Sequence, residues 1–210
     1  MKVERAQLLV YGITDERYLK GRTLEECVEQ ALKGGATVIQ LRDKHADEET
    51  LLKEAESLQA VCERFQAPLI INDDIELALR VGAAGAHVGQ DDMAVSEARA
   101  KLGADRILGV TAHNVAEALA AEQQGADYLG CGAMFTTGTK DDAVPMTREE
   151  FREICNAVSI PVVAIGGITA ENAPQLQGIG AAGLSVSGGL FAEEDIEAAA
   201  GKLRAAAELL

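Results

Sequence analysis

Short apolar runs alternate with longer amphipathic segments along almost the whole chain. Such runs are typical of buried strands, and eight are predicted: Leu8–Thr14, Thr37–Leu41, Leu69–Ile71, Ala86–Gly89, Ile107–Thr111, Tyr128–Gly132, Pro161–Ile165 and Gly183–Val186. Between them the apolar residues recur at helical spacing, as in the stripe formed by Leu51, Ala55, Leu58, Cys62 and Phe65. The pattern therefore predicts strands and helices in alternation.

Local signals mark the ends of the predicted helices. Three segments have Thr or Asn followed three positions later by Glu, which is the spacing of a capping box: Thr23–Glu26, Asn114–Glu117 and Thr147–Glu150. Helices are expected to begin there. Glycines that follow helical stretches, at Gly34, Gly125 and Gly180, are expected to end them.

Strands that alternate with helices imply a parallel sheet with right-handed crossovers. Eight such units in 210 residues, with no linker or low-complexity segment, favour a single-domain α/β fold over residues 1–210, the (β/α)8 TIM barrel. The alternative is an open, doubly wound sheet. The first strand-to-helix turn, Gly12–Asp15, lacks the GxGxxG dinucleotide fingerprint, which counts against that alternative.

Composition limits the kinds of partner. The formal net charge of −15 argues against binding to nucleic acid or to an anionic membrane, because both need a basic face. An anionic small-molecule substrate would need a few focused cations and a metal to attract it. Four scattered cysteines without a CxxC motif, and the absence of any apolar run near 18 residues, lead us to expect a cytoplasmic protein with reduced thiols. The oligomeric state is open, and a homo-oligomer is compatible with the sequence.

Two acidic clusters follow neighbouring predicted strands. Asp73 and Asp74 come after the third strand, and Asp91 and Asp92 come after the fourth. In one crevice, two carboxylates about 4 Å apart repel by roughly 4 kcal/mol at an effective dielectric of 20, so they favour a hard cation. The alternative role is helix capping, which we assign to Asp74 and which is also open to Asp91 and Asp92. Asp73 and Asp92 are thus the candidate ligands of Mg²⁺.

Cationic and glycine-rich segments at other strand ends suit a phosphorylated substrate. Period-two geometry predicts that Gln40, Arg42 and Lys44 share one face, where they would clamp a pyrophosphate unless the strand simply emerges into solvent. Gly166–Gly167 and Ser187–Gly189 follow the seventh and eighth strands, the usual phosphate site of barrels, although ordinary turn glycines follow the same pattern.

The long loop and the histidines carry weaker signals. Thr137, Thr139 and Lys140 suit either a lid over an anion or a routine solvated connection. No HxxxH motif or Cys/His cluster supports a zinc site, and no GxSxG motif supports a nucleophilic triad. His87 alternates with apolar neighbours, so it is expected to line the barrel rather than to catalyse.

In this order, the clusters resemble those of the thiamine phosphate synthases over nearly the full chain. Members of that family are (β/α)8 barrels that join hydroxymethylpyrimidine pyrophosphate to a thiazole phosphate, or to its carboxylated precursor, and release pyrophosphate. The resemblance implies magnesium at Asp73 and Asp92 and catalytic charge stabilisation by Arg42, Lys44 and Lys140. It implies substrate-binding roles for a larger set: Gln40, Arg42, Lys44, Asn72, Thr111, Thr137, Gly138, Thr139, Lys140, Gly167, Val186 and Ser187.

The chain departs from the family at two positions, and two other functions stay open. Ala133 and Thr136 stand where the family has prolines, so the loop that follows is expected to be less preorganised. One alternative function resembles the thiazole tautomerase, a related barrel that needs neither a metal pair nor a pyrophosphate clamp. The other is a non-catalytic barrel that binds a phosphorylated metabolite, which could dispense with most of these charged residues.

Overall fold

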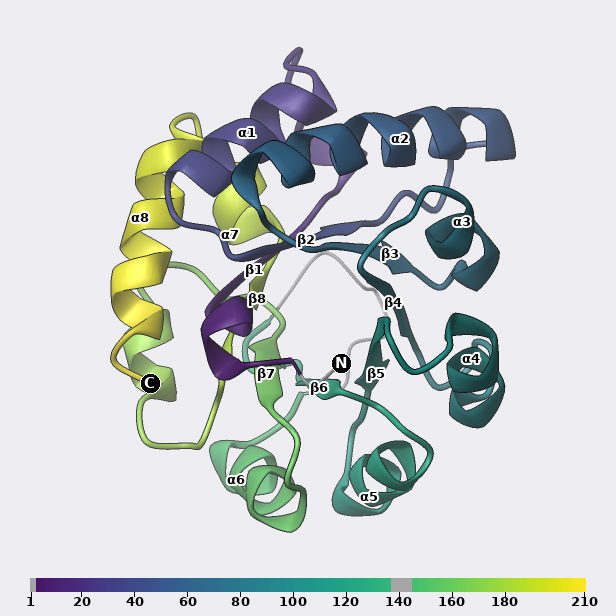
Figure 1. The fold of residues 1–210 in the computed structure, drawn as a ribbon. Coiled ribbons are helices and arrows are strands. Elements are labelled where there is room, and N and C mark those ends of the chain that lie inside the picture. Colours follow the sequence, from purple (N-terminus) through teal and green to yellow (C-terminus); the bar gives the residue numbers. More distant parts are fainter. Residues whose placement is uncertain (1–2, 137–144) are drawn as a thin grey trace.

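Eight parallel strands close into a barrel in the computed structural model, which describes residues 3–136 and 145–210. The strand order follows the sequence, and β1 pairs with both β2 and β8. The strands are β1 Val10–Ile13, β2 Val38–Leu41, β3 Leu69–Asn72, β4 Gly85–Val88, β5 Ile107–Thr111, β6 Tyr128–Cys131, β7 Val162–Ile165 and β8 Gly183–Val186. Figure 1 shows the strands at the centre, with the helices around them. The predicted TIM barrel is confirmed, and the open sheet is wrong.

Helices cover the outside of the barrel. They are α1 Leu24–Lys33, α2 Glu48–Phe65, α3 Ile75–Arg80, α4 Val95–Leu102, α5 Val115–Gln123, α6 Arg148–Ala157, α7 Gly188–Phe191 and α8 Ile196–Ala207, with short 3₁₀ turns η1 Arg5–Leu8, η2 Glu16–Tyr18 and η3 Ala173–Leu176. The predicted starts of α1, α5 and α6 are confirmed, because Thr23, Asn114 and Thr147 each cap their helix. In the part of the chain described, no helix combines the length and apolar character that crossing a bilayer requires.

The seventh crossover differs from the prediction. A helix was expected to end near Gly180, but only the 3₁₀ turn η3 forms there, and it ends at Leu176. Pro174 lies inside this turn, and Gly178 and Gly180 both adopt positive φ, at 72° and 93°. Proline is tolerated in a first turn, but the left-handed glycines that follow Leu176 do not continue a helix, so the segment stops after one turn.

Two apolar cores follow from strand alternation. Along β1, Val10 packs in the large core against the helices, whereas Tyr11 and Ile13 belong to a smaller core inside the barrel. Val38 of β2 and Tyr128 of β6 join that inner core. The barrel is therefore filled by side chains and leaves functional residues only at its ends.

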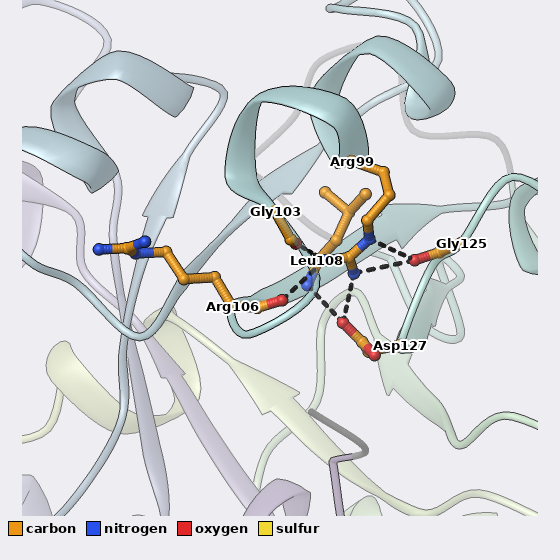
Figure 2. Close-up of polar contacts among 6 residues, drawn as sticks. All are labelled: Arg99, Gly103, Arg106, Leu108, Gly125 and Asp127. Atoms are coloured by element: carbon orange, nitrogen blue, oxygen red, sulfur yellow. Dashed lines mark hydrogen bonds and ion pairs between the residues drawn. The ribbon is translucent and has the colours of Figure 1, made fainter.

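Arg99 of α4 binds the residues that precede β5 and β6 at the amino-terminal end of the barrel. Its guanidinium donates to the backbone carbonyls of Gly103, Arg106 and Gly125 and forms an ion pair with Asp127 at 2.5 Å. Figure 2 shows these bonds converging on one side chain. The Asp127 carboxylate also accepts from the backbone N–H of Leu108 at 2.9 Å. A single arginine thus joins a helix to the starts of two strands.

Candidate active site

The carboxyl ends of the strands bring most of the predicted site residues to one mouth of the barrel. Three of them end a strand (Asn72, Thr111 and Val186), Gln40 is the last but one in its strand, and the others follow a strand closely: Arg42, Lys44, Asp73, Asp92, Gly167 and Ser187. Because all eight strands are parallel, these positions share one end. Four predicted site residues lie outside the described residues: Thr137, Gly138, Thr139 and Lys140.

Asp73 and Asp92 meet at this mouth, and their carboxyl groups hydrogen-bond to each other. The side-chain amide of Asn72 donates to Asp73 Oδ2 at 2.6 Å, and the Lys44 ammonium lies 3.6 Å from the same oxygen. Asp92 Oδ2 also accepts from the backbone N–H of Gly89 at 2.7 Å. Asp73 adopts φ 63°, in the left-handed region that Asp and Asn tolerate better than most residues.

The carboxyl pair has the electrostatics of a cation site. Burial raises the pKa of Asp73 to about 6, with the hydrogen bond and charge of Asp92 adding to it and Lys44 opposing it. A hydrogen bond between two carboxyls needs a shared proton, because two ionised carboxylates repel. A divalent cation can take the place of that proton, so the two residues fit a metal ion. No group of three or more His, Cys, Asp or Glu among the described residues could hold a metal, so ligand oxygens would complete the shell.

The neighbouring aspartates have different roles. Asp74 caps α3 by accepting from the backbone N–H of Leu77 at 2.8 Å, as predicted. The capping alternative is wrong for Asp91 and Asp92, because the N-cap residue of α4 is Ala94, and the Gln124 side chain accepts from the first turn at Ser96 instead. Asp91 is exposed.

The residues after β2 reach the mouth in a way that differs from the prediction. β2 ends before Arg42, and the Asp43 carboxylate accepts from the backbone N–H groups two and three residues ahead, which turns the chain. The predicted period-two face therefore stops with Gln40, which is buried inside the barrel at 3% exposure. Lys44 reaches Asp73 from the turn, whereas Arg42 lines a small hollow with Thr14 and Glu54.

In the loop after β7 the backbone of Gly167 lies close to that of Thr136, and in the loop after β8 the Ser187 hydroxyl lacks a hydrogen-bond partner among the described residues. Gly166 and Gly167 have positive φ, at 98° and 62°, and a Cβ on Gly167 would lie 2.3 Å from the Thr136 carbonyl oxygen. Only glycine fits there. The Ser187 hydroxyl is buried and has no hydrogen-bond partner within the described part of the chain. A buried, unpartnered hydroxyl is costly unless a ligand binds it, so Ser187 indicates a ligand-binding loop.

Sequence reasoning missed three buried polar groups. Asp15 is 6% exposed just after β1, and the Arg17 side chain donates to both of its oxygens. Burial opposes these bonds, yet together with the nearby charges they lower the pKa of Asp15. Tyr11 and Tyr128 carry hydroxyls into the barrel interior, where Tyr128 bonds His87. Tyrosine at an inward strand position was the available signal, since a buried hydroxyl needs a partner. His87 lines the barrel, as expected.

Fold and mouth together define the class: a TIM barrel whose carboxyl end brings together paired carboxylates, an ammonium and glycine-rich loops. A family model described as thiamine monophosphate synthase matches residues 10–190. The chain belongs to that family, and it is an enzyme, a transferase of thiamine biosynthesis.

Known relatives support this assignment over nearly the whole chain. A thiamine-phosphate synthase of Ruminiclostridium cellulolyticum is 45% identical over 194 residues, covering 92% of each chain. One of Nitrosococcus oceani is 47% identical, covering 93% of this chain and 90% of that protein. The solved thiamine phosphate pyrophosphorylase of Pyrococcus furiosus is 36% identical, with a TM-score of 0.89 over 97% of both chains. The resemblance is confirmed, and neither the tautomerase nor the non-catalytic alternative is favoured.

Proposed function

We propose that this chain condenses hydroxymethylpyrimidine pyrophosphate with thiazole phosphate, or its carboxylated form, to give thiamine phosphate and pyrophosphate. The observation that carries the proposal is the meeting of Asp73, Asp92 and Lys44 at one mouth of the barrel. The two carboxylates suit a metal ion, and the Lys44 ammonium beside them suits phosphate oxygens. Together they match a diphosphate substrate, which carries a metal ion and negative charge. We further propose that the chain acts in the cytoplasm as a single domain over residues 1–210.

Asp73 and Asp92 would hold Mg²⁺. The support is their shared hydrogen bond and the raised pKa of Asp73, since a cation favours both carboxylates in the ionised form. When bound, the ion would offset the negative charge of pyrophosphate oxygens, which complete its shell. Magnesium commonly needs only one or two protein carboxylates in such sites.

The cationic side chains would stabilise charge on the leaving group. The bond between the pyrimidine methylene and the pyrophosphate oxygen breaks, its electron pair goes to pyrophosphate, and the thiazole nitrogen captures the cationic methylene. Lys44 lies beside the carboxyl pair, whereas Arg42 lines a separate hollow with Glu54 and would have to reach the pyrophosphate from there. Lys140 belongs to the segment outside the described residues. Positioning and electrostatics would supply most of the rate, with little proton transfer by the protein.

The remaining residues would bind the two substrates. Gln40, Asn72 and Thr111 suit the polar edges of the pyrimidine. The unpartnered Ser187 hydroxyl, with Val186 at the end of β8 and Gly167 after β7, suits the thiazole phosphate, together with Thr137, Gly138 and Thr139. This division puts the two reactants on opposite sides of one mouth.

Pyrophosphate release tests the proposal. Purified protein is mixed with both substrates, with and without Mg²⁺, and each substrate is omitted in turn. We expect release only when both substrates and the metal are present, and EDTA should suppress it. No release with either thiazole form would contradict the proposal and favour a binding protein. Isomerisation of the thiazole compound without pyrophosphate release would favour the tautomerase.

Replacing Lys140 separates rate from affinity. Lys140→Ala should lower kcat by about 100-fold, because charge on the leaving group develops only in the transition state. The KM for the thiazole phosphate should change far less. Lys101→Ala is a suitable control, since Lys101 pairs with Glu76 on the surface. Equal losses in kcat and in thiazole affinity would argue against the assigned role.

A further inference from the structure

A continuous chain of polar side chains crosses the barrel interior beneath the mouth. The Gln40 amide nitrogen donates to the Tyr11 hydroxyl at 2.8 Å, and this hydroxyl lies 2.6 Å from that of Tyr128. The Tyr128 hydroxyl lies 3.0 Å from His87 Nδ1, and His87 Nε2 lies 3.0 Å from the Thr111 hydroxyl. We name these five side chains the interior relay. It joins β2, β1, β6, β4 and β5.

The two ends of the relay are candidate substrate residues, but its middle is not. Tyr11 and Tyr128 are 1% and 0% exposed, so neither tyrosine can touch a ligand at the mouth. Burial raises the pKa of both tyrosines well above the ordinary value, so both hydroxyls keep their hydrogens. The two tyrosines can therefore act on a substrate only through the other relay residues, Gln40, His87 and Thr111.

The backbone makes specific room for the relay. A Cβ on Gly109 would lie 2.2 Å from the Tyr128 hydroxyl oxygen and 2.5 Å from His87 Nδ1. A Cβ on Gly130 would lie 3.3 Å from His87 Cε1. Gly109 and Gly130 face inward and have no side chain, so they leave space where His87 and Tyr128 meet. That space holds a hydrogen bond in a region where apolar side chains would otherwise fill the barrel.

With the Gln40 amide nitrogen toward Tyr11, counting hydrogens gives one direction for the relay. Tyr11 accepts a hydrogen from the Gln40 amide, so its own hydrogen goes to Tyr128. Tyr128 then donates to His87 Nδ1, which leaves the imidazole hydrogen on Nε2 and directs it to Thr111. In the reverse direction, the Tyr11 hydrogen would point at the Gln40 amide hydrogens. A buried hydroxyl hydrogen without an acceptor is costly.

We propose that Tyr11, Tyr128 and His87 are positioning residues that fix the polarity of the pyrimidine pocket. With its amide nitrogen held by Tyr11, Gln40 offers its oxygen as an acceptor. With its oxygen occupied by His87, Thr111 offers its hydrogen as a donor. Gln40 on β2 thus presents an acceptor and Thr111 on β5 a donor, which complement the amino N–H group and a bare ring nitrogen of an aminopyrimidine. The oxo analogue carries an acceptor in place of the amino group, so it mismatches the Gln40 oxygen.

Phenylalanine variants test this inference, which rests on the proposed function. Tyr11→Phe and Tyr128→Phe each remove one relay hydroxyl and keep the ring. Each should raise the KM for the aminopyrimidine pyrophosphate by about 10-fold and lower the preference over its oxo analogue by a similar factor, with kcat and the thiazole KM nearly unchanged. Thr37→Val is the matched control, because the Thr37 hydroxyl bonds the Val10 backbone at the other end of the barrel.

A second measurement does not depend on turnover. Nitrogen NMR of histidine-labelled protein should find the His87 hydrogen on Nε2 in the wild type. Tyr128→Phe should keep it there and shift the Nδ1 resonance toward that of an acceptor without a hydrogen bond, because Nδ1 loses its donor, while Thr37→Val leaves both resonances unchanged. An Nδ1 hydrogen in the wild type would overturn the proposed polarity. Unchanged pyrimidine KM and substrate preference in both phenylalanine variants would overturn the positioning role. If the wild type itself releases no pyrophosphate, the proposed function fails, and the tautomer still tests the relay.

Discussion

The two ends of the barrel use charged side chains in opposite ways. At the amino end, Arg99 and Asp127 carry opposite charges, and each side chain is at most 20% exposed. The guanidinium also bonds three backbone carbonyls (Figure 2). At the carboxyl end, Asp73 and Asp92 are both acids, and the Lys44 ammonium lies 3.6 Å from Asp73.

The contrast separates stability from function within one fold. A half-buried pair of opposite charges with further hydrogen bonds stabilises the segments that it joins. A pair of like charges with one member partly buried, such as Asp73 beside the exposed Asp92, opposes folding and is typical of a ligand site. The Arg99–Asp127 pair therefore stabilises the amino end, whereas the Asp73–Asp92 pair carries an electrostatic cost at the mouth. Substitutions at the two ends should consequently affect different measurements.

The largest effect is expected at the amino end. Arg99→Ala leaves the Asp127 charge unpaired and three carbonyls without their donor, so the free energy of unfolding should fall by about 3–5 kcal/mol. Chemical denaturation measures this loss. Arg106→Ala is the matched control, because Arg106 contributes its backbone carbonyl and its side chain extends away from the cluster in Figure 2. A small loss in Arg99→Ala, or an equal loss in the control, would show that this end is not a stability centre.

The next effect is on the rate, at the mouth. Asp73→Asn should lower kcat by about 100-fold, or roughly 2.7 kcal/mol, because one of two proposed metal ligands loses its charge. Stability should stay equal or rise, since the repulsion with Asp92 disappears and Asn tolerates positive φ. Steady-state kinetics and denaturation of the same preparation give both numbers.

The adjacent carboxylate provides the control for that substitution. Asp74 caps α3, so Asp74→Ala should cost about 1 kcal/mol of stability and leave kcat unchanged. Neighbouring aspartates would then have opposite phenotypes, one in rate and one in stability. If Asp74→Ala lowered kcat as far as Asp73→Asn, the assignment of Asp73 as metal ligand and Asp74 as helix cap would be contradicted.

The sequence predicted what depends on local chemistry. Apolar runs located all eight strands to within a few residues, and capping residues located the starts of α1, α5 and α6. The role of Asp74 followed from the same local rule. These features depend on residues close in sequence, so a pattern in the chain is enough to predict them.

Features that depend on distant contacts were not predicted. The alternation beyond Gln40 failed because the Asp43 carboxylate turns the chain by bonding two backbone N–H groups. The meeting of Tyr11 with Tyr128, 117 residues apart, depends on how the strands stagger as the barrel closes. Nothing in the local pattern around either tyrosine specifies that partner. The interior relay therefore appears only in three dimensions.

The smallest effect concerns a third carboxylate near the mouth. Glu54 of α2 lines the same hollow as Arg42, and one of its carboxylate oxygens is buried without a hydrogen-bond partner in the described part of the chain. Burial raises the pKa of Glu54 to about 7, and the charges of Asp43, Glu16 and Glu25 raise it further. As at Asp73, burial and nearby negative charges disfavour the ionised form of the Glu54 carboxyl group.

Because folding raises the pKa of Glu54, the folded state favours the protonated form. Its contribution is fully present below the unfolded-state value of 4.5 and is lost as the pH rises through about 7. Glu54→Gln should therefore be more stable than the wild type by about 1 kcal/mol at pH 8, a modest gain because water screens a half-exposed charge. The difference should vanish near pH 4.5. Denaturation across this range measures it, with the exposed Glu56→Gln as control. A gain independent of pH would mean that Glu54 is not strained by ionisation, and the electrostatic cost at the mouth would then rest on the Asp73 pair alone.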